Sequence, residues 1–144
     1  MLDTDISVSV IRRRSSRVLQ RFEAIPPNNM SISIATYAEL YFGAVKSSLI
    51  EHNLHVLEEY AARLLVLQWD RDAASEYGRL RAHLEAQGNP IGVFDTMIAA
   101  HALSLDATIV TNNVRHFKRV PDLKLENWDV AEDHSTNGQN GRSK

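Results

Sequence analysis

The chain has 144 residues, of which 44% are hydrophobic and 24% charged, a composition typical of one soluble globular domain. The absence of cysteine excludes disulfides, thiolate-bound metals and thiol catalysis, and the net charge of −2 argues against indiscriminate binding to nucleic acid. No apolar run is long enough for a membrane span, and the first residues lack the basic-then-apolar order of a signal peptide. We therefore expect a cytoplasmic protein.

Short apolar runs alternate with longer amphipathic segments along the chain. Leu2 predicts a very short strand, and residues 6–19 predict a helix that is broken near Ser15. Pro26 begins a loop, and the alternation over residues 30–34 predicts a second strand. A helix is expected to follow that strand directly.

The rest of the chain continues this alternation. Helices are expected over residues 51–64, 70–87 and 95–105, and short strands over residues 65–67, 108–111 and 123–128. Strands separated by helices need crossover connections, so the pattern predicts an α/β fold with a parallel sheet covered by helices on both faces. We place one domain at residues 1–128 and expect the polar residues 129–144 to form a disordered tail.

Acidic residues stand at the ends of apolar segments, where parallel sheets place their ligands. Asp3 follows the first strand, with Asp5 two residues later. Glu39 lies in the first turn of the helix after the second strand, and Asp95 opens a later helix. Each acid also has a structural interpretation: Asp3 or Asp5 as a helix cap, Glu39 as the capping-box partner of Thr36, and Asp95 as an acid favoured by the helix dipole.

Asp95 is the hardest of these acids to explain structurally, because its helix is too apolar for a surface helix. A buried carboxylate without a partner costs on the order of several kcal/mol. Carboxylates from distant segments repel one another unless a cation lies between them, and Mg²⁺ and Mn²⁺ prefer such oxygen ligands. The pattern therefore favours hydrolysis of phosphodiester bonds assisted by one or two metal ions.

Four motifs follow one another in the chain. They are LDTDI at residues 2–6, YAELYFGA at 37–44, GNPIG with FDTMIAAHA at 88–102, and VTNNVRHF at 110–117. The sequence LENW at residues 125–128 completes the set. In this order the motifs resemble the PIN-domain ribonucleases, and in particular the VapC-like toxins of toxin–antitoxin pairs. The resemblance covers residues 1–128.

The resemblance implies the α/β PIN-like fold and an endoribonuclease activity that depends on Mg²⁺, with Mn²⁺ as a substitute. Such an enzyme hydrolyses RNA, often tRNA, with water that the metal activates, and it acts as the toxin of its pair. The family further implies a VapB-like antitoxin as partner and a homodimer, with no membrane association.

The same resemblance assigns roles to individual residues. Asp3, Glu39 and Asp95 match the acids that bind Mg²⁺, and Asn113 joins them in the catalytic set. The supporting residues are Thr4, Asp5, Thr111 and Asn112. Independently of the resemblance, Arg12, Arg13, Arg14 and Arg115 lie in two basic clusters, which indicate either contacts to RNA phosphates or a solvated helix face.

The chain departs from the family pattern at three positions. Asp5 stands where Asn is common, so its charge either tightens metal binding or raises the pKa of Asp3 by repulsion. Asn113 stands where many PIN nucleases carry Asp, which predicts weaker binding of a second metal ion. His116 stands where Glu is frequent, and the sequence alone assigns it no role.

The other histidines have structural interpretations. His101 lies in an apolar helix and is expected to be a hydrogen-bonded core residue. His52 and His55 are spaced three apart, but no third ligand is near them in the sequence, so we expect a solvated helix face.

Two alternatives compete with the nuclease. A phosphoacceptor receiver domain also uses acids at strand ends, but it needs a Lys late in the chain beside a strand, and none follows the strand at residues 108–111 until Lys118. A PIN-like module without activity would bind RNA or protein only. Metal-dependent RNA cleavage that is lost when Asp95 is replaced distinguishes the enzyme from such a module.

Overall fold

A computed structural model describes residues 1–131 of the chain, so most of the tail predicted at residues 129–144 lies outside the described residues. The helices are α1 (Thr4–Ile11), α2 (Ser16–Ala24), α3 (Ile34–Lys46), α4 (Ile50–Ala61), α5 (Arg71–Ala86), α6 (Val93–Ser104) and α7 (Val114–Phe117), with a short 3-10 turn at Pro27–Asn29. The strands are β1 (Ser31–Ser33), β2 (Leu65–Leu67), β3 (Ile109–Val110) and β4 (Leu125–Glu126). Within residues 1–131, no helix is long and apolar enough to cross a membrane.

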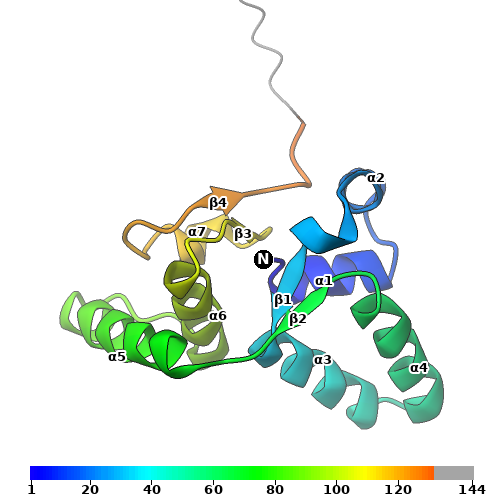
Figure 1. Cartoon of the computed structure of the whole chain (residues 1–144), viewed down its shortest axis with the longest axis horizontal. Coiled ribbons are helices and arrows are strands. Elements are labelled where there is room, and N and C mark those ends of the chain that lie inside the picture. The colour runs from blue at the N-terminus through cyan, green and yellow to red at the C-terminus, as the bar shows by residue number, and fades with distance from the viewer. Residues whose placement is uncertain (132–144) are drawn as a thin grey trace, which may run out of the picture.

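The strands form two parallel pairs that the N-terminus joins. β1 pairs with β2, and β3 pairs with β4, both in parallel. Between them, the Leu2 amide donates to the Ser31 carbonyl at 2.8 Å, and the Asp3 amide donates to the Val110 carbonyl at 3.0 Å. Figure 1 shows the N-terminus between β1 and β3. The short strand predicted at Leu2 is therefore confirmed as the bridge at the centre of the array.

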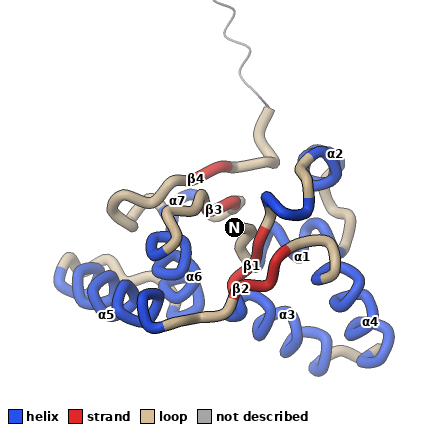
Figure 2. The backbone as a smooth tube through the Cα atoms, viewed as in Figure 1, coloured by secondary structure: helices blue, strands red, loops and turns tan. Residues whose placement is uncertain are grey.

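Helices cover both faces of this array, as expected. Consecutive strand residues point to opposite faces. Leu2 and Val110 accordingly belong to a core that includes residues of α1, α2 and α4, whereas Met1 and Ile109 belong to a second core with α5, α6 and α7. Figure 2 shows α1, α2 and α4 on one side of the strands and α5 and α6 on the other. The central strand carries Asp3 directly after these core residues.

The helix predicted over residues 6–19 is interrupted near Ser15, as expected. Arg13 adopts a left-handed conformation with φ of 51°, which ends α1. The Ser15 hydroxyl then accepts from the Val18 amide at 3.4 Å and caps α2. The break places the exposed residues Arg12–Arg14 on a turn beside the end of α1.

Three predicted helix starts are too late: α1 begins at Thr4 and not at Ile6, and the starts of α3 and α6 differ as well. The N-cap of α3 is Ser33, whose hydroxyl accepts from the Ala35 amide at 3.1 Å, so Thr36 is a buried helical residue and forms no capping box with Glu39. The helix starts early because the chain passes from β1 straight into α3. This places Glu39 in the second turn. Likewise α6 begins at Val93, so Asp95 lies within its first turn and does not open it.

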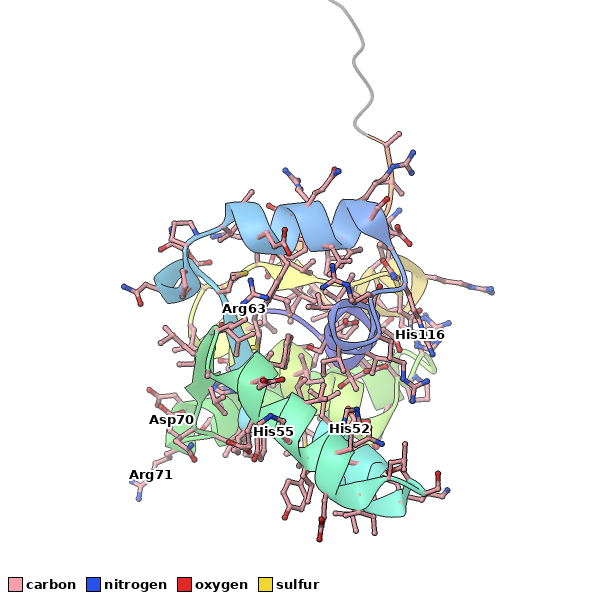
Figure 3. The ribbon with its side chains drawn as sticks, turned by 90° about the vertical axis from the view of Figure 1, so that its right-hand side faces the viewer. His52, His55, Arg63, Asp70, Arg71 and His116 are labelled. Atoms are coloured by element: carbon pink, nitrogen blue, oxygen red, sulfur yellow. The ribbon has the colours of Figure 1, made fainter. Side chains whose placement is uncertain are left out.

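Helix α7 was not predicted, because four residues are too few to show a helical period. The helix is anchored by Phe117, whose side chain is completely buried. The predicted solvated face at α4 is confirmed for His52 and His55, which lie exposed on that helix (Figure 3).

Candidate active site

Asp3 caps a helix, as its structural interpretation predicted, and it also lies among the acids of the predicted site. It is the N-cap of α1, and its Oδ1 accepts from the Ile6 amide at 2.9 Å. It is also 3% exposed, which is rare for a carboxylate, and no lysine or arginine of residues 1–131 pairs with it. Burial raises the pKa of Asp3 to about 7, against the opposing hydrogen bonds from the Ile6 amide and the Thr111 side chain.

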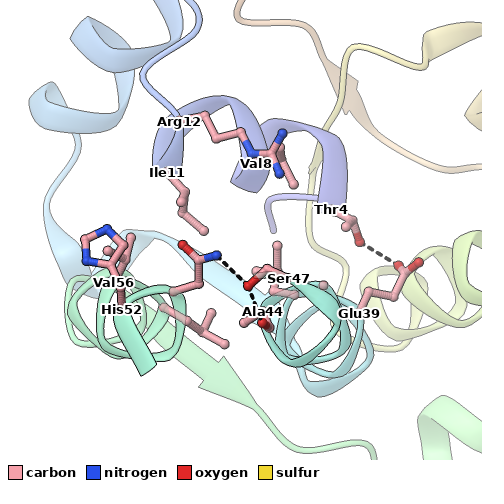
Figure 4. A pocket seen from close by; sticks show the side chains of 13 residues that line it. Thr4, Val8, Ile11, Arg12, Glu39, Ala44, Ser47, His52 and Val56 are labelled. Atoms are coloured by element: carbon pink, nitrogen blue, oxygen red, sulfur yellow. Dashed lines mark hydrogen bonds between the residues drawn. The ribbon is translucent and has the colours of Figure 1, made fainter. Parts of the chain in front are cut away.

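Glu39 and Asp95 reach the same region from two other helices. Glu39 on α3 accepts from the Thr4 hydroxyl at 2.6 Å (Figure 4). Burial raises the pKa of Glu39 and of Asp95 as well. The charge of Asp95 adds to the shift at Asp3 and at Glu39, and the charge of Asp5 adds to the shift at all three. The expected repulsion between Asp5 and Asp3 is therefore present.

The segment after β3 supplies the polar neighbours of these acids. Thr111 is completely buried, and its hydroxyl accepts from the Asn113 amide at 2.8 Å. The Asn113 side-chain amide lies 2.8 Å from Nδ1 of His116, and the same Nδ1 lies 3.7 Å from Oδ2 of Asp95. The structure thus brings Thr111 and Asn113 to the predicted site and adds His116 to it.

Two buried serines behind the site were missed by the sequence interpretation. Ser7 donates to the Asp3 carbonyl at 2.7 Å and accepts from the Tyr60 hydroxyl at 2.8 Å. Ser33 lies 2.8 Å from Nδ1 of His101, which confirms His101 as a hydrogen-bonded core residue. The signal available for Ser7 was its helical spacing of four from Asp3.

Two of the predicted phosphate-binding arginines line cavities that reach the site. Arg12 borders a cavity of about 300 Å³ together with Thr4 and Glu39 (Figure 4). Arg14 borders a second cavity of about 320 Å³ together with Asp5 and Asn112. Arg13 and Arg115 are exposed and line neither cavity.

The chemistry of the donors fits a divalent cation. Three carboxylates come from three different segments, each with a pKa raised by burial and by the charge of its neighbours. Hard cations are bound by such oxygens. As the side chains lie, Asp3 and Glu39 accept hydrogen bonds from Ile6 and Thr4, and no three acidic or histidine side chains of residues 1–131 stand close enough to hold one ion together. Binding therefore requires side-chain rotation at these acids.

This fold with its carboxylate edge is that of a PIN domain, and a family model for the PIN domain matches residues 1–123. The chain is 45% identical to a tRNA(fMet)-specific endonuclease VapC of Shigella flexneri, over 89% of this chain and 96% of the relative. It is 44% identical to ribonuclease VapC2 of Haemophilus influenzae with the same coverage. The crystal structure of VapBC2 from Rickettsia felis bound to a promoter DNA fragment superposes with a TM-score of 0.85, at 39% identity over 90% of this chain and 98% of that chain.

The chain therefore belongs to the PIN-domain family, and within it to the VapC-like nucleases. The motif order in the sequence predicted this membership, and the parallel α/β arrangement agrees with it.

Proposed function

We propose that this chain is a Mg²⁺-dependent endoribonuclease that acts as the toxin of a toxin–antitoxin pair. The observation that carries the proposal is the arrangement of Asp3, Glu39 and Asp95 at one edge of the sheet, where the charge of Asp95 helps to raise the pKa of both other carboxylates. Membership in the VapC-like nucleases supports the same reaction class.

The residues have distinct roles in this proposal. Asp3, Glu39 and Asp95 hold the ion, with Mn²⁺ as a substitute for Mg²⁺. A bound divalent ion supplies Lewis acidity toward the phosphate and lowers the pKa of water. Glu39 also orients the attacking water, and the Thr4 hydroxyl, which donates to Glu39 at 2.6 Å, keeps this carboxylate at the site until a side-chain rotation brings it to the ion. Thr111 and Asn113 support the site, because the Thr111 side chain hydrogen-bonds to Asp3 and its hydroxyl accepts from the Asn113 amide.

The proposed substrate is RNA, and tRNA in particular, because a relative with 45% identity is named a tRNA(fMet)-specific endonuclease. Arg12 and Arg14 would neutralise phosphates on either side of the cut, since each borders one of the two cavities beside the acids. Arg13 and Arg115 are further candidates for phosphate contacts.

The proposed protein partner is a VapB-like antitoxin, as in the complexes that the similar structures contain. A groove beside the active site suits a peptide segment of such a partner, because it joins apolar residues of three helices to Glu39 (Figure 4). The groove is lined on its apolar side by Val8, Ile11, Leu40, Val56 and Leu57. A segment in this groove would cover Glu39 and block the site.

A homodimer is also proposed, because α3, the start of α4 and the start of α6 expose large apolar side chains that a monomer would leave in water. These residues are Tyr41, Phe42, Val45, Leu49, Ile50, Val93 and Phe94. Light scattering of the purified chain measures the mass, and Phe42→Glu should reduce it to that of one chain.

The experiment that tests the activity examines the product ends. Initiator tRNA is incubated with the full chain and Mg²⁺, with and without EDTA, and the products are analysed for terminal phosphates. We expect a 5′-phosphate and a 3′-hydroxyl, because water is the nucleophile and the ribose 2′-hydroxyl takes no part. Replacing the ribose at the cut site by 2′-deoxyribose should therefore preserve cleavage.

Two results would contradict the proposal. A 2′,3′-cyclic phosphate on the product, or cleavage that survives EDTA, would show that the 2′-hydroxyl attacks without a metal. Binding of RNA or antitoxin without any cleavage of a panel of cellular RNAs would instead favour the inactive PIN-like module.

A further inference from the structure

His101 is a buried polar residue that joins three segments of the fold. It lies on α6, the helix that also carries Asp95, and it is only 2% exposed. Nδ1 of His101 lies 2.8 Å from the Ser33 hydroxyl, and the ring also hydrogen-bonds to the backbone of Gln68. Ser33 and Leu67 are partners at the ends of β1 and β2, and Figure 1 shows both strands leaving the sheet there, toward α3 and α5. The imidazole therefore connects α6 to both strand ends.

The hydrogen bonds of this group have defined directions. Burial lowers the pKa of His101, so the ring is neutral at pH 7, with one donor and one acceptor nitrogen. The bond with the Gln68 backbone acts to raise that pKa, as expected for a ring N–H that donates to a carbonyl. Nδ1 is thus left to accept from the Ser33 hydroxyl. The Ser33 oxygen in turn accepts from the Ala35 amide at 3.1 Å, where it caps α3.

These bonds link the two helices that carry Glu39 and Asp95. Ser33 stands six residues before Glu39, at the start of α3, and His101 stands six residues after Asp95 on α6. Each carboxylate is therefore about 9 Å along its helix from the same hydrogen bond. Helices α3 and α6 are in contact as well. Directional bonds between buried polar groups fix one relative orientation of the helices, which apolar contacts alone leave adjustable.

We propose that His101 is a positioning residue of the active site: its hydrogen bond with Ser33 fixes α6 against the start of α3 and thereby sets the separation of Asp95 from Glu39. This role rests on the proposed metal-dependent cleavage, in which both carboxylates hold the ion. A misplacement of about 1 Å, caused by a change far from the chemistry, is enough to slow an enzyme by about a hundredfold.

The test compares five forms of the full chain: wild type, His101→Leu, His101→Asn, Ser33→Gly and Leu84→Ala. Leucine removes both hydrogen bonds of the imidazole, whereas Oδ1 of asparagine is an acceptor that replaces Nδ1 opposite the Ser33 hydroxyl. Ser33→Gly removes that hydroxyl, and glycine is tolerated as a helix N-cap. Leu84→Ala is the matched control, because Leu84 is 2% exposed on α5 in the core that α6 also lines, and its side chain makes no hydrogen bond.

Two properties of each form are measured well below its melting temperature, so that every chain is folded. Calorimetric titration gives the affinity for Mn²⁺, and cleavage of initiator tRNA with Mg²⁺ gives kcat and KM. We expect His101→Leu and Ser33→Gly to lower kcat by at least about thirtyfold and to weaken Mn²⁺ binding by about tenfold. KM should change by less than about threefold, because the arginines proposed to contact phosphates lie outside this group of hydrogen bonds.

The remaining two variants separate positioning from stability. His101→Asn should keep kcat within about fivefold of wild type, because the acceptor for Ser33 is restored. Leu84→Ala should lower the melting temperature, while its kcat and Mn²⁺ affinity stay within about twofold of wild type.

Three results would overturn the positioning role. If His101→Leu lowers only the melting temperature, as Leu84→Ala does, His101 is a structural residue. If His101→Asn loses as much kcat as His101→Leu, the bond with Ser33 is not what sets the site. If His101→Leu does not fold, Ser33→Gly decides the question with the imidazole intact, and wild-type kcat and Mn²⁺ affinity in that variant refute the role.

The Asp95→Asn variant separates this role from the proposed function. If Asp95→Asn loses cleavage and Mn²⁺ binding while His101→Leu and Ser33→Gly retain both, the metal-dependent function stands and the role of His101 is refuted. If Asp95→Asn cleaves RNA and binds Mn²⁺ as wild type does, the proposed metal site itself is wrong, and the positioning role falls with it.

Discussion

Helices α5 and α6 pack against each other, but the charged side chains of α5 form exposed ion pairs, whereas the one acid of α6 is partly buried. On α5, Arg79 pairs with Glu76 and Arg81 pairs with Glu85, each at 2.8 Å and largely in water. On α6, Asp95 is the only acid, and no lysine or arginine among residues 1–131 forms an ion pair with it. Burial raises the pKa of Asp95.

The two helices therefore differ in how their charged side chains affect stability: those of α5 stabilise the fold slightly, whereas Asp95 on α6 destabilises it. Exposed pairs at helical spacing contribute about 0.3 to 0.5 kcal/mol each and cost little when removed. A carboxylate that is partly buried among other carboxylates destabilises the folded chain, and such positions cluster at functional sites. The comparison predicts that replacing Asp95 on α6 strongly reduces RNA cleavage, whereas breaking an ion pair on α5 changes neither cleavage nor the unfolding free energy appreciably.

The largest effect is expected for Asp95→Asn. The change keeps the shape of the side chain but removes one charge that holds the cation, so RNA cleavage with Mg²⁺ should fall by at least about a thousandfold. The melting temperature in EDTA should stay equal or rise, because a repulsive charge is gone. Asp106→Asn is the matched control, since Asp106 follows α6 and pairs in water with Lys124. Activity of Asp95→Asn within tenfold of wild type would remove Asp95 from the site.

A second effect concerns stability against pH in the presence of EDTA. Burial raises the pKa of Asp3 from 3.8 to about 7, so the folded chain holds its proton more tightly than the unfolded chain. The resulting stabilisation is complete below about pH 4 and is lost as the pH rises through about 7, on the order of a few kcal/mol in total.

Chemical denaturation at pH 4.5 and pH 7.5 measures this loss, and Asp3→Asn isolates it. Asn is also a good N-cap, so α1 remains capped in the variant. The difference in unfolding free energy between variant and wild type should grow with pH. A difference that is the same at both pH values would mean that Asp3 is charged throughout.

A smaller effect is expected for Asn113→Asp, which replaces a neutral oxygen ligand by a charged one. Binding of a second divalent ion should tighten by about tenfold, measured by calorimetric titration with Mn²⁺. Asn29→Asp is the control, because Asn29 is exposed on the 3-10 turn Pro27–Asn29 and lines neither cavity. Unchanged or weaker affinity in Asn113→Asp would show that this side chain does not face the ions.

The smallest effect should follow Arg81→Ala on α5. The Arg81–Glu85 pair is about half exposed on both sides, so its loss should change the unfolding free energy by less than about 0.5 kcal/mol and leave cleavage unchanged. A denaturation curve and a cleavage assay measure the two quantities. A loss of more than about 1 kcal/mol would contradict the distinction between the two helices.

Most of the secondary structure followed from periodicity, and the errors have local causes. The strands were correctly placed because short apolar runs between helical segments leave few alternatives. The start of α3 was misplaced because Ser33, at the end of β1, caps the helix before Thr36 can. Helix α7 was missed because its four residues are held by the burial of Phe117, which leaves no pattern in the sequence.

The sequence by itself determined the order of the motifs, the α/β class and the identity of Asp3, Glu39 and Asp95 as the acids of interest. It could do so because residue type and spacing along the chain are local properties. Only the tertiary structure decided that Asp95 raises the pKa of Asp3 and of Glu39, that Thr4 holds Glu39, and that His116 faces Asp95. Those facts depend on how α1, α3, α6 and α7 pack around the central strand, and packing is set by contacts between residues far apart in sequence.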